Sequence, residues 1–275
     1  MKPKTFYSFE SSTASSKKRA RWLAFLFILM VALVMVYFFL SMRYHQSERA
    51  YLNAYVDDNL SFQRQGSTLE SGINILLLGL DYPDEGRLEA KSITSLAIAN
   101  LSAKEIKVKL LDPERLDLAQ DDFSSLDSTS FEQIGSQVSQ LSQEAIDYYW
   151  LVDYDQLAEL VDQFPGQRFQ FDRDYHLDRI MVQAGSSETL TKRQMHHILA
   201  KSEIESQMDW NQRQINIWMQ YLHNWSLALF SNDFEAWSQA LYGTVQTNMP
   251  FSLWIKFVSY QYFLNQFEIT LYTSI

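Results

Sequence analysis

Few residues of this chain have the types and spacing that chemistry needs. The 275-residue sequence has no cysteine, so it offers neither a disulfide nor a thiolate metal ligand. It contains no GxSxG, P-loop or HExxH pattern. His196 and His197 are adjacent, and adjacent side chains on a helix point about 100° apart. They therefore cannot form the i, i+4 pair of a helical zinc site, and surface positions are the better interpretation.

Asp81 is the first acidic residue in a position typical of a site. It directly follows the apolar run INILLLGL at 73–80, which is bounded by Gly72 and Pro83. A short apolar run with such ends is typical of a buried central strand. An aspartate at the end of that strand could ligate a metal or could cap the following loop. The sequence leaves these two roles open.

The elements that must position such residues are strands interleaved with helices. Apolar residues at spacings of 3, 4 and 3 indicate an amphipathic helix at 130–144. This interleaving predicts a layered α/β domain. The pattern predicts strands at 73–80, 93–100, 106–112, 148–154, 168–177 and 267–273, and helices at 130–144, 155–164, 191–206, 209–230 and about 250–264.

One segment is long and apolar enough to cross a membrane. From Trp22 to Met42 the chain carries no charge over 21 residues, which as a helix spans about 30 Å, the thickness of a bilayer core. Basic residues precede it, mainly KKRAR at 17–21, so the positive-inside rule places the N-terminus in the cytoplasm. A cleaved signal peptide is the alternative. The length of the run and its bulky end, FFLSMRY, favour a signal anchor that is retained.

The charge is divided unevenly along the chain. Residues 1–42 carry six basic residues and one acidic residue, a net charge of +5. The remainder carries 17 basic and 32 acidic residues, a net charge of −15. An outer domain that is this acidic is poorly suited to nucleic acid, and an anionic ligand would need a local basic pocket.

The order of segments resembles the LytR–CpsA–Psr (LCP) family of cell-envelope proteins. A basic tail, one span and a stalk are followed by a strand that ends in Gly-Leu-Asp at 79–81. The paired strands at 92–111, the piece IDYYWLVDYDQLAELVDQF at 146–164 and TNMPFSLWIKF at 247–257 continue the resemblance. It implies an LCP-like layered domain with a central mixed β-sheet flanked by helices, preceded by one transmembrane helix.

The resemblance also implies an activity. Family members face outward and transfer glycan polymers from a polyprenyl-pyrophosphate carrier onto peptidoglycan, using Mg²⁺. Such a site needs guanidinium groups and a metal with carboxylate ligands around the pyrophosphate, and an apolar groove for the lipid. No cofactor is expected unless the site is active, in which case it would take Mg²⁺.

The family's charged positions are only partly kept at the strand ends. Its acidic metal position falls on Asp81. Its Arg-Ser-Asp begins at Ser92 and ends at Thr94, so one arginine and the second carboxylate are missing. Its Pro-Arg-Asp keeps Arg115, with the aspartate replaced or shifted to Asp117. The resemblance makes Asp81 a candidate metal ligand and Arg115 a remnant of a phosphate site.

The helical positions are also depleted. The family's Arg-x-Arg pair falls on the tripeptide centred on Lys201, which lacks the bidentate fork of arginine. Its Asp-x-x-Arg-x-x-Arg-Gln run falls on DWNQRQIN, which begins at Asp209. Here Gln212 replaces the first arginine, while Arg213 and Gln214 lie one or two positions out of place. Lys201, Arg213 and Gln214 complete the remnant phosphate site that the resemblance implies.

These losses favour a degenerate, non-catalytic relative that binds a partner protein or a lipid-linked glycan during cell-envelope assembly. Two alternatives stay open: an active phosphotransferase whose charges come from shifted residues, and a membrane sensor or regulator. We expect four parts: a cytoplasmic basic tail at 1–21, a transmembrane helix at 22–42, a juxtamembrane stalk at 43–72 and an extracellular LCP-like domain at 73–275.

Overall fold

The computed structural model describes residues 11–57, 60, 72–82, 91–102, 106–116, 128–171, 174–177, 180–201, 205–256 and 269–273. The chain forms two compact units, Met1–Gln46 and Ser47–Ile275. The first unit contains most of helix α1 (Ser11–Tyr51). Among the described residues, one helix is long and apolar enough to cross a membrane, and the window that qualifies is not buried. Trp22, at 66% exposed, is typical of its side chains.

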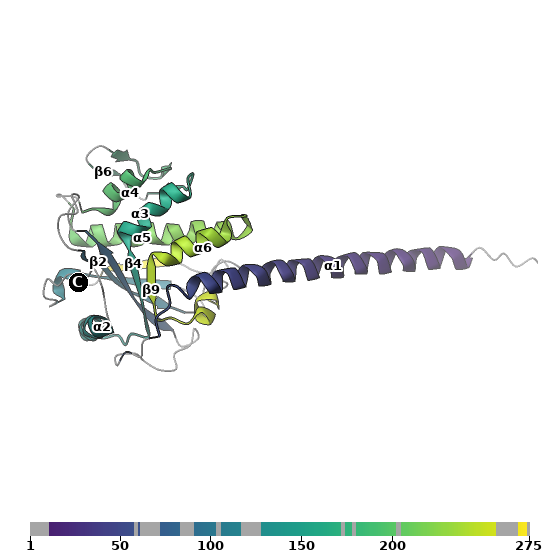
Figure 1. Cartoon of the computed structure of the whole chain (residues 1–275), viewed down its shortest axis with the longest axis horizontal. Helices are drawn as coiled ribbons and strands as arrows, with labels where there is room; N and C mark the ends of the chain where they lie inside the picture. Colours follow the sequence, from purple (N-terminus) through teal and green to yellow (C-terminus); the bar gives the residue numbers. More distant parts are fainter. Residues whose placement is uncertain are drawn as a thin grey trace, which may run out of the picture. The chain divides into compact units, whose positions relative to one another are not determined.

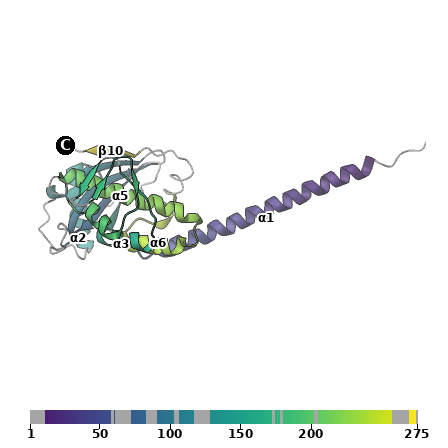
Figure 2. The same ribbon diagram turned by 90° about the horizontal axis from the view of Figure 1, so that it is seen from above.

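The second unit is built on a six-stranded sheet. The strand order is β10-β3-β2-β1-β4-β9. β1 (Ile73–Asp81) lies at its centre, antiparallel to β2 (Ser92–Leu101) and parallel to β4 (Tyr148–Asp153). β3 (Ile106–Leu111) pairs with β2, and β9 (Val245–Thr247) pairs with β4. β10 (Ile269–Thr273) forms the other edge (Figure 2).

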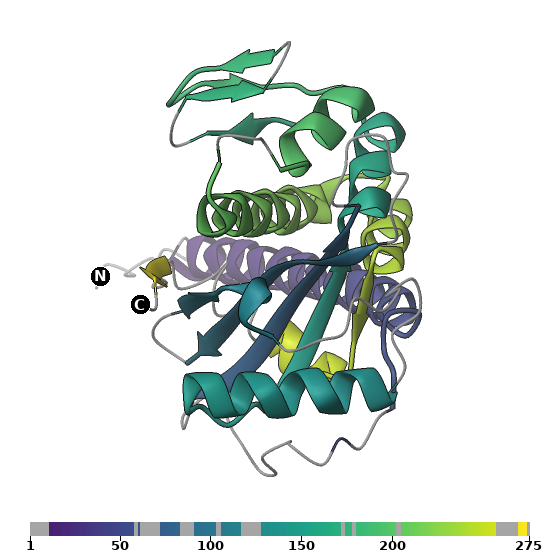
Figure 3. The same cartoon turned by 90° about the vertical axis from the view of Figure 1, so that its left-hand side faces the viewer.

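Helices cover both faces of this sheet (Figures 1 and 3). α2 (Ser128–Ser142) packs Phe131, Ile134 and Val138 against one face. α3 (Tyr154–Gln163), α5 (Gln207–Leu227) and α6 (Phe234–Gly243) cover the other, over a core rich in aromatic side chains. The expected mixed sheet flanked by helices is confirmed. β1 is buried on both faces because helices cover both sides of the sheet at its centre.

Smaller elements connect these layers. After β3 comes the 3₁₀ helix η1 (Pro113–Arg115), and η2 (Ala228–Phe230) joins α5 to α6. α4 (Lys192–Leu199) precedes α5 and begins with a capping box at Thr191. Two small sheets join β5 (Phe169–Gln170) to β8 (Ser187–Glu188) and β6 (Tyr175–Leu177) to β7 (Ile180–Val182).

Several expected elements differ from the structure. The expected strand at 168–177 is two short strands, β5 and β6, and the expected helix at 191–206 ends at Leu199 as α4. α6 and β9 were not expected, although α6 buries Phe234, Trp237 and Leu241 at helical spacing. Residues 251–256 are helical, and the rest of the expected helix to 264 lies outside the described residues.

The start of the expected stalk at 43–72 also differs from the structure. Tyr51 is fully buried in the second unit, and its hydroxyl donates to the carbonyl of Met249 at 2.8 Å. Tyr55 forms a parallel bridge with Thr247 beside β9. Aromatic packing therefore draws the segment after Ser47 into the folded unit. Most of the remaining stalk, including 61–71, lies outside the described residues.

Candidate functional site

The candidate site lies where several strands end at one edge of the sheet. β1 and β4 are parallel, so their last residues, Asp81 and Asp153, lie at the same edge. β2 runs the other way, and its first residue, Ser92, pairs with Asp81. β3 ends at this edge as well and leads into η1. The sheet topology thus brings together the strand ends on which the expected charged positions fall.

Asp81 is buried at this edge, at 6% exposed. One carboxylate oxygen, Oδ1, accepts the backbone N–H of Tyr82 at 2.8 Å. The other, Oδ2, accepts the side-chain amide of Gln214 at 3.4 Å. The first contact resembles a loop cap, and the second joins Asp81 to α5. The structure therefore shows the loop-capping role that the sequence left open for this residue.

Gln214 is fully buried and ties three elements together. Its Nε2 donates to Asp81 and also to the carbonyl of Leu199, at 3.1 Å. Its Oε1 accepts the hydroxyl of Thr94 at 3.0 Å. Thr94 stands where the family resemblance expects a carboxylate. The centre of the site is thus one carboxylate held by neutral amide and hydroxyl groups.

Lys201 reaches the same network through a neighbouring glutamine. Its Nζ donates to Oε1 of Gln207 at 2.7 Å, and Nε2 of Gln207 donates to the carbonyl of Thr94 at 3.2 Å. The ammonium also lies 3.7 Å from the carboxylate of Glu114 and 5.6 Å from the ring centre of Trp210. Its charge is therefore shared between an acidic partner and an aromatic face.

Arg115 follows Glu114, the partner of Lys201, and no hydrogen bond joins its side chain to the buried network within the described part of the chain. It ends η1 and is exposed, one residue after Glu114. The Asp112 side chain caps η1 by accepting the N–H of Glu114 at 3.0 Å. This short helix holds Arg115 at the rim of the site.

The charge of Arg213 is neutralised by Glu205, and its side chain does not contact Asp81 in the described structure. Its side chain is 1% exposed, and its Nε donates to Glu205 at 3.0 Å while Nη2 contacts the second oxygen of the same carboxylate. Nη2 also donates to the carbonyl of Ala200 at 3.0 Å. The guanidinium lies 5.6 Å from the ring centre of Tyr175. Arg213 and Gln214 are neighbours on α5, so their side chains leave it in different directions and reach different partners.

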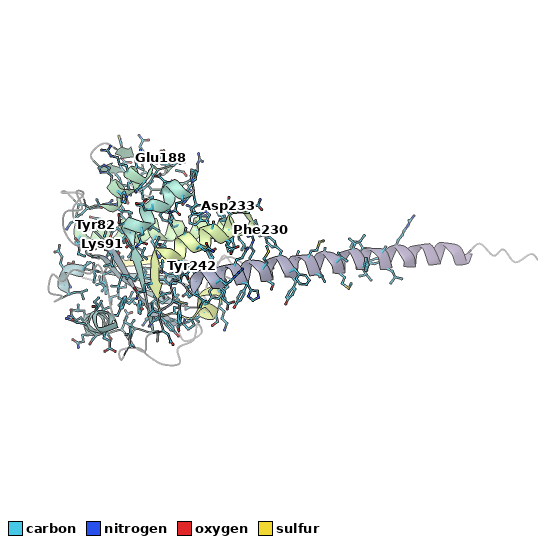
Figure 4. All side chains as sticks on the ribbon, in the orientation of Figure 1. Tyr82, Lys91, Glu188, Phe230, Asp233 and Tyr242 are labelled. Carbon is cyan, nitrogen blue, oxygen red and sulfur yellow. The ribbon has the colours of Figure 1, made fainter. Side chains whose placement is uncertain are left out.

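A second polar cluster, of Lys91, Asp153 and Asp155, lies at the same edge and was not predicted from the sequence. Lys91 donates to both oxygens of Asp153, at 2.9 and 2.7 Å, and lies 3.6 Å from Asp155. Its Nζ lies 5.3 Å from the ring centre of Tyr82 (Figure 4). Burial lowers the pKa of Lys91, but the two aspartates raise it by more, so the pKa lies above its usual value. The positions of Lys91 directly before β2 and of Asp153 at the end of β4 could have indicated this pair.

The described residues around Asp81 provide a single carboxylate for a Mg²⁺ site. Magnesium is usually held by one or two carboxylates together with water and substrate phosphates. Here each oxygen of the only carboxylate at the centre already accepts an N–H, and Thr94 replaces the second acid. Within the described part of the chain, no group of three or more acidic or histidine side chains could hold a metal.

The fold is shared with solved structures of LCP proteins. The chain resembles B. subtilis TagV at 17% identity, with a TM-score of 0.54, over 76% of this chain and 87% of that one. It also resembles TagT bound to LIIa-WTA, at 14% identity and a TM-score of 0.52, over 79% and 86%. An Enterococcus faecalis protein described as a transcriptional regulator gives 15% identity and a TM-score of 0.51, over 76% and 78%.

The chain therefore has the LytR–CpsA–Psr fold that its sequence predicts, in a divergent form. No family model and no curated protein matches its sequence. At identities of 14–17%, the solved neighbours share the fold of this chain.

Proposed function

We propose that this chain is a membrane-anchored protein of bacterial cell-envelope assembly that binds a lipid-linked glycan without transferring it. Helix α1 is the proposed anchor, with the basic tail in the cytoplasm and the folded unit outside. The LCP fold and the apolar helix support the cell-envelope setting. The arrangement of charges in the site supports binding over transfer. A protein partner at the same site is the alternative occupant.

One observation carries this proposal: a buried glutamine, Gln214, occupies the centre of the site beside Asp81. Transfer from a pyrophosphate carrier builds negative charge on the leaving phosphate, and cations must stabilise it. Gln214 carries no charge, and its amide is already bonded to Asp81, Thr94 and Leu199. The groups of this network are neutral apart from the Asp81 carboxylate, so the network supplies little positive potential for a phosphate.

The nearby cations compensate only in part. Glu205 neutralises Arg213, and Glu114 lies close to Lys201. Arg115 is exposed at the rim, where water screens its charge. Losing one electrostatic contact to a developing charge commonly costs about 2.7–4 kcal/mol, or roughly 10²–10³ in rate. The resemblance expects arginine at Ser92 and Gln212 as well, so several such contacts are absent together.

A transfer assay tests the proposal. The full-length chain in detergent, with Mg²⁺ and a glycan linked to polyprenyl pyrophosphate, should release no polyprenyl phosphate above a protein-free reaction. The same preparation should bind the lipid-linked glycan in a pull-down or fluorescence assay. An active LCP transferase assayed in parallel shows that the substrate is competent.

Two substitutions distinguish binding from catalysis. Asp81→Ala and Arg115→Ala should each leave the cellular role intact, because neither residue needs to act on a leaving group. If either variant folds and reaches the membrane but abolishes the role, the strand-end site is in use and the non-catalytic proposal is wrong. Measurable release of polyprenyl phosphate by the parent chain has the same meaning and would overturn the proposal.

A further inference from the structure

A separate cavity lies on the outer side of α5, between that helix and the small strands β5 and β6. Its volume is about 340 Å³. Figure 3 shows these strands beyond α5, on the side away from the central sheet. The cavity is lined by Arg213, so it lies on the face of α5 where that guanidinium is turned away from Asp81. It is distinct from the network around Asp81 and Gln214.

The lining divides into an apolar floor and a polar rim. Phe171, Tyr175 and Ile217 are buried and form the floor. Asn216 on the rim is half-buried, and Gln170 is exposed. The floor offers apolar and aromatic surface, while the rim offers amide donors and acceptors. A ligand that fits both must itself carry an apolar face and uncharged polar groups.

The charge of the lining excludes most anions as the natural ligand. Among the lining residues that the structure describes, Arg213 carries the only ionised side chain, and Glu205 pairs with it through two of its nitrogens. A phosphate or carboxylate entering the cavity would meet a cation whose charge is already compensated. It would also lose its hydration without a full replacement. A neutral ligand avoids this cost.

One donor in the lining residues has no partner. Nη1 of Arg213 is buried and makes no hydrogen bond to any residue that the structure describes. An unsatisfied buried N–H on a charged group is costly, and such groups commonly mark a bound water or ligand. Arg213 and Tyr175 both line the cavity, and the Tyr175 ring centre lies 5.6 Å from the guanidinium. A ligand hydroxyl or carbonyl oxygen within reach of Nη1 would satisfy it.

We propose that this cavity binds a neutral sugar residue. A sugar ring has an apolar face for Phe171 and Ile217, and hydroxyl groups for Asn216 and for Nη1 of Arg213. This inference rests on the proposed function, since it names the part of the glycan that the chain recognises. It assigns recognition to the uncharged sugar, at a place separate from the strand-end site, and not to the phosphate.

The test is direct binding of uncharged and charged probes to the full-length chain in detergent. The probes are the neutral N-acetylglucosamine tetrasaccharide and inorganic phosphate, observed by saturation-transfer NMR and titration. The tetrasaccharide should bind, and phosphate at the same concentration should not displace it. Absence of tetrasaccharide binding, or displacement by phosphate, overturns the proposal.

Matched variants locate the binding. Asn216→Trp fills the rim and should weaken tetrasaccharide binding at least tenfold. Asn232→Trp makes the same change at an exposed position between η2 and α6 and should leave binding within twofold. Equal binding by both variants overturns the assignment. Circular dichroism and thermal melting confirm that each variant folds.

A second change keeps the proposal testable if Asn216→Trp does not fold. The double variant Arg213→Met with Glu205→Gln removes Nη1 without leaving an unpaired charge, and it should weaken binding at least fivefold. A crystal structure that shows only a water on Nη1 after soaking with the tetrasaccharide also overturns the proposal. Polyprenyl phosphate release is measured separately, so transfer activity would contradict the proposed function and leave the sugar-binding result to stand by itself.

Discussion

Arg213 and Glu205 form an ion pair in which the arginine side chain is 1% exposed and the glutamate 12%. The pair joins the middle of α5 to the residues that follow α4, and the carbonyl of Ala200 accepts a further bond from the same guanidinium. A buried cation is tolerated only when a partner compensates for its lost hydration. This pair is therefore a structural requirement of the helical layer, which explains why Arg213 is not available to Asp81.

Removal of the glutamate should destabilise the fold strongly. Glu205→Ala leaves Arg213 buried without its counter-ion, and breaking such a pair costs about 3–5 kcal/mol. Glu159→Ala is the matched control, since its pair with Lys192 is 42% and 38% exposed and exposed pairs contribute only about 0–1 kcal/mol. Urea unfolding of both variants measures the difference. Equal losses would contradict the structural role of the buried pair.

Gly79 should tolerate no side chain. A Cβ built on Gly79 would overlap the ring of Tyr154 and the hydroxyl of Ser95, whose hydroxyl groups are hydrogen-bonded to each other at 3.1 Å. Gly79→Ala should therefore cost roughly 1–3 kcal/mol or more through overpacking. Gly243→Ala, at the end of α6, meets no atom within 4 Å and should stay within about 1 kcal/mol of the parent. Thermal melting of the two variants decides the comparison.

The sequence predicted the sheet better than the site. β1, β2, β3, β4 and β10 have apolar or alternating runs that are visible without any tertiary information, and all five were expected. The position of Asp81 at a strand end followed from the same pattern. α6 was missed although Phe234, Trp237 and Leu241 have the spacing of one helix face, because the segment is only ten residues long.

The hydrogen-bond partners of the site residues depend on the direction in which each side chain leaves its helix, which the sequence does not show. Gln214 and Arg213 are adjacent in sequence, yet one faces Asp81 and the other faces Glu205. A linear motif could place both on α5 but could not assign their directions, because a shift of one residue turns a helical side chain by about 100°. The pairing of Lys91 with Asp153 joins the start of β2 to the end of β4, two strands that lie on either side of β1 in the folded sheet. Tyr51, within the expected stalk, is buried because it packs against Tyr242, a residue far along the chain.

Two buried tyrosines should respond in opposite ways to loss of their hydroxyl. The Tyr221 hydroxyl has no hydrogen-bond partner among the described residues, so Tyr221→Phe should be neutral or stabilising by up to about 1 kcal/mol. The Tyr242 hydroxyl accepts the indole N–H of Trp254 at 2.8 Å, so Tyr242→Phe leaves that donor unpaired and should cost about 1–3 kcal/mol. Chemical unfolding of both variants tests this contrast. A stabilised Tyr242→Phe would contradict it.

Stability should fall at alkaline pH. Burial raises the pKa of Tyr154 and of Tyr242 well above the usual value, and the two aspartates raise the pKa of Lys91. The folded chain therefore keeps protons that the unfolded chain releases near about pH 10. The stabilisation is complete below that pH and is lost as pH rises through the folded-state pKa values. Melting temperatures measured from pH 8 to 11 should drop above about pH 10, and a flat profile would contradict the assigned pKa directions.

The proposed orientation can be measured directly because the chain has no native cysteine. Asn232→Cys places a single thiol at an exposed position of the folded unit, and Ser15→Cys places one in the basic tail. The positive-inside rule puts the six basic residues of the tail in the cytoplasm. A membrane-impermeant maleimide added to intact cells should therefore label Asn232→Cys and not Ser15→Cys. After lysis both should react, which shows that each thiol is accessible. Labelling of only the tail in intact cells would reverse the orientation, and recovery of a shortened chain from the medium would show that the apolar helix is cleaved.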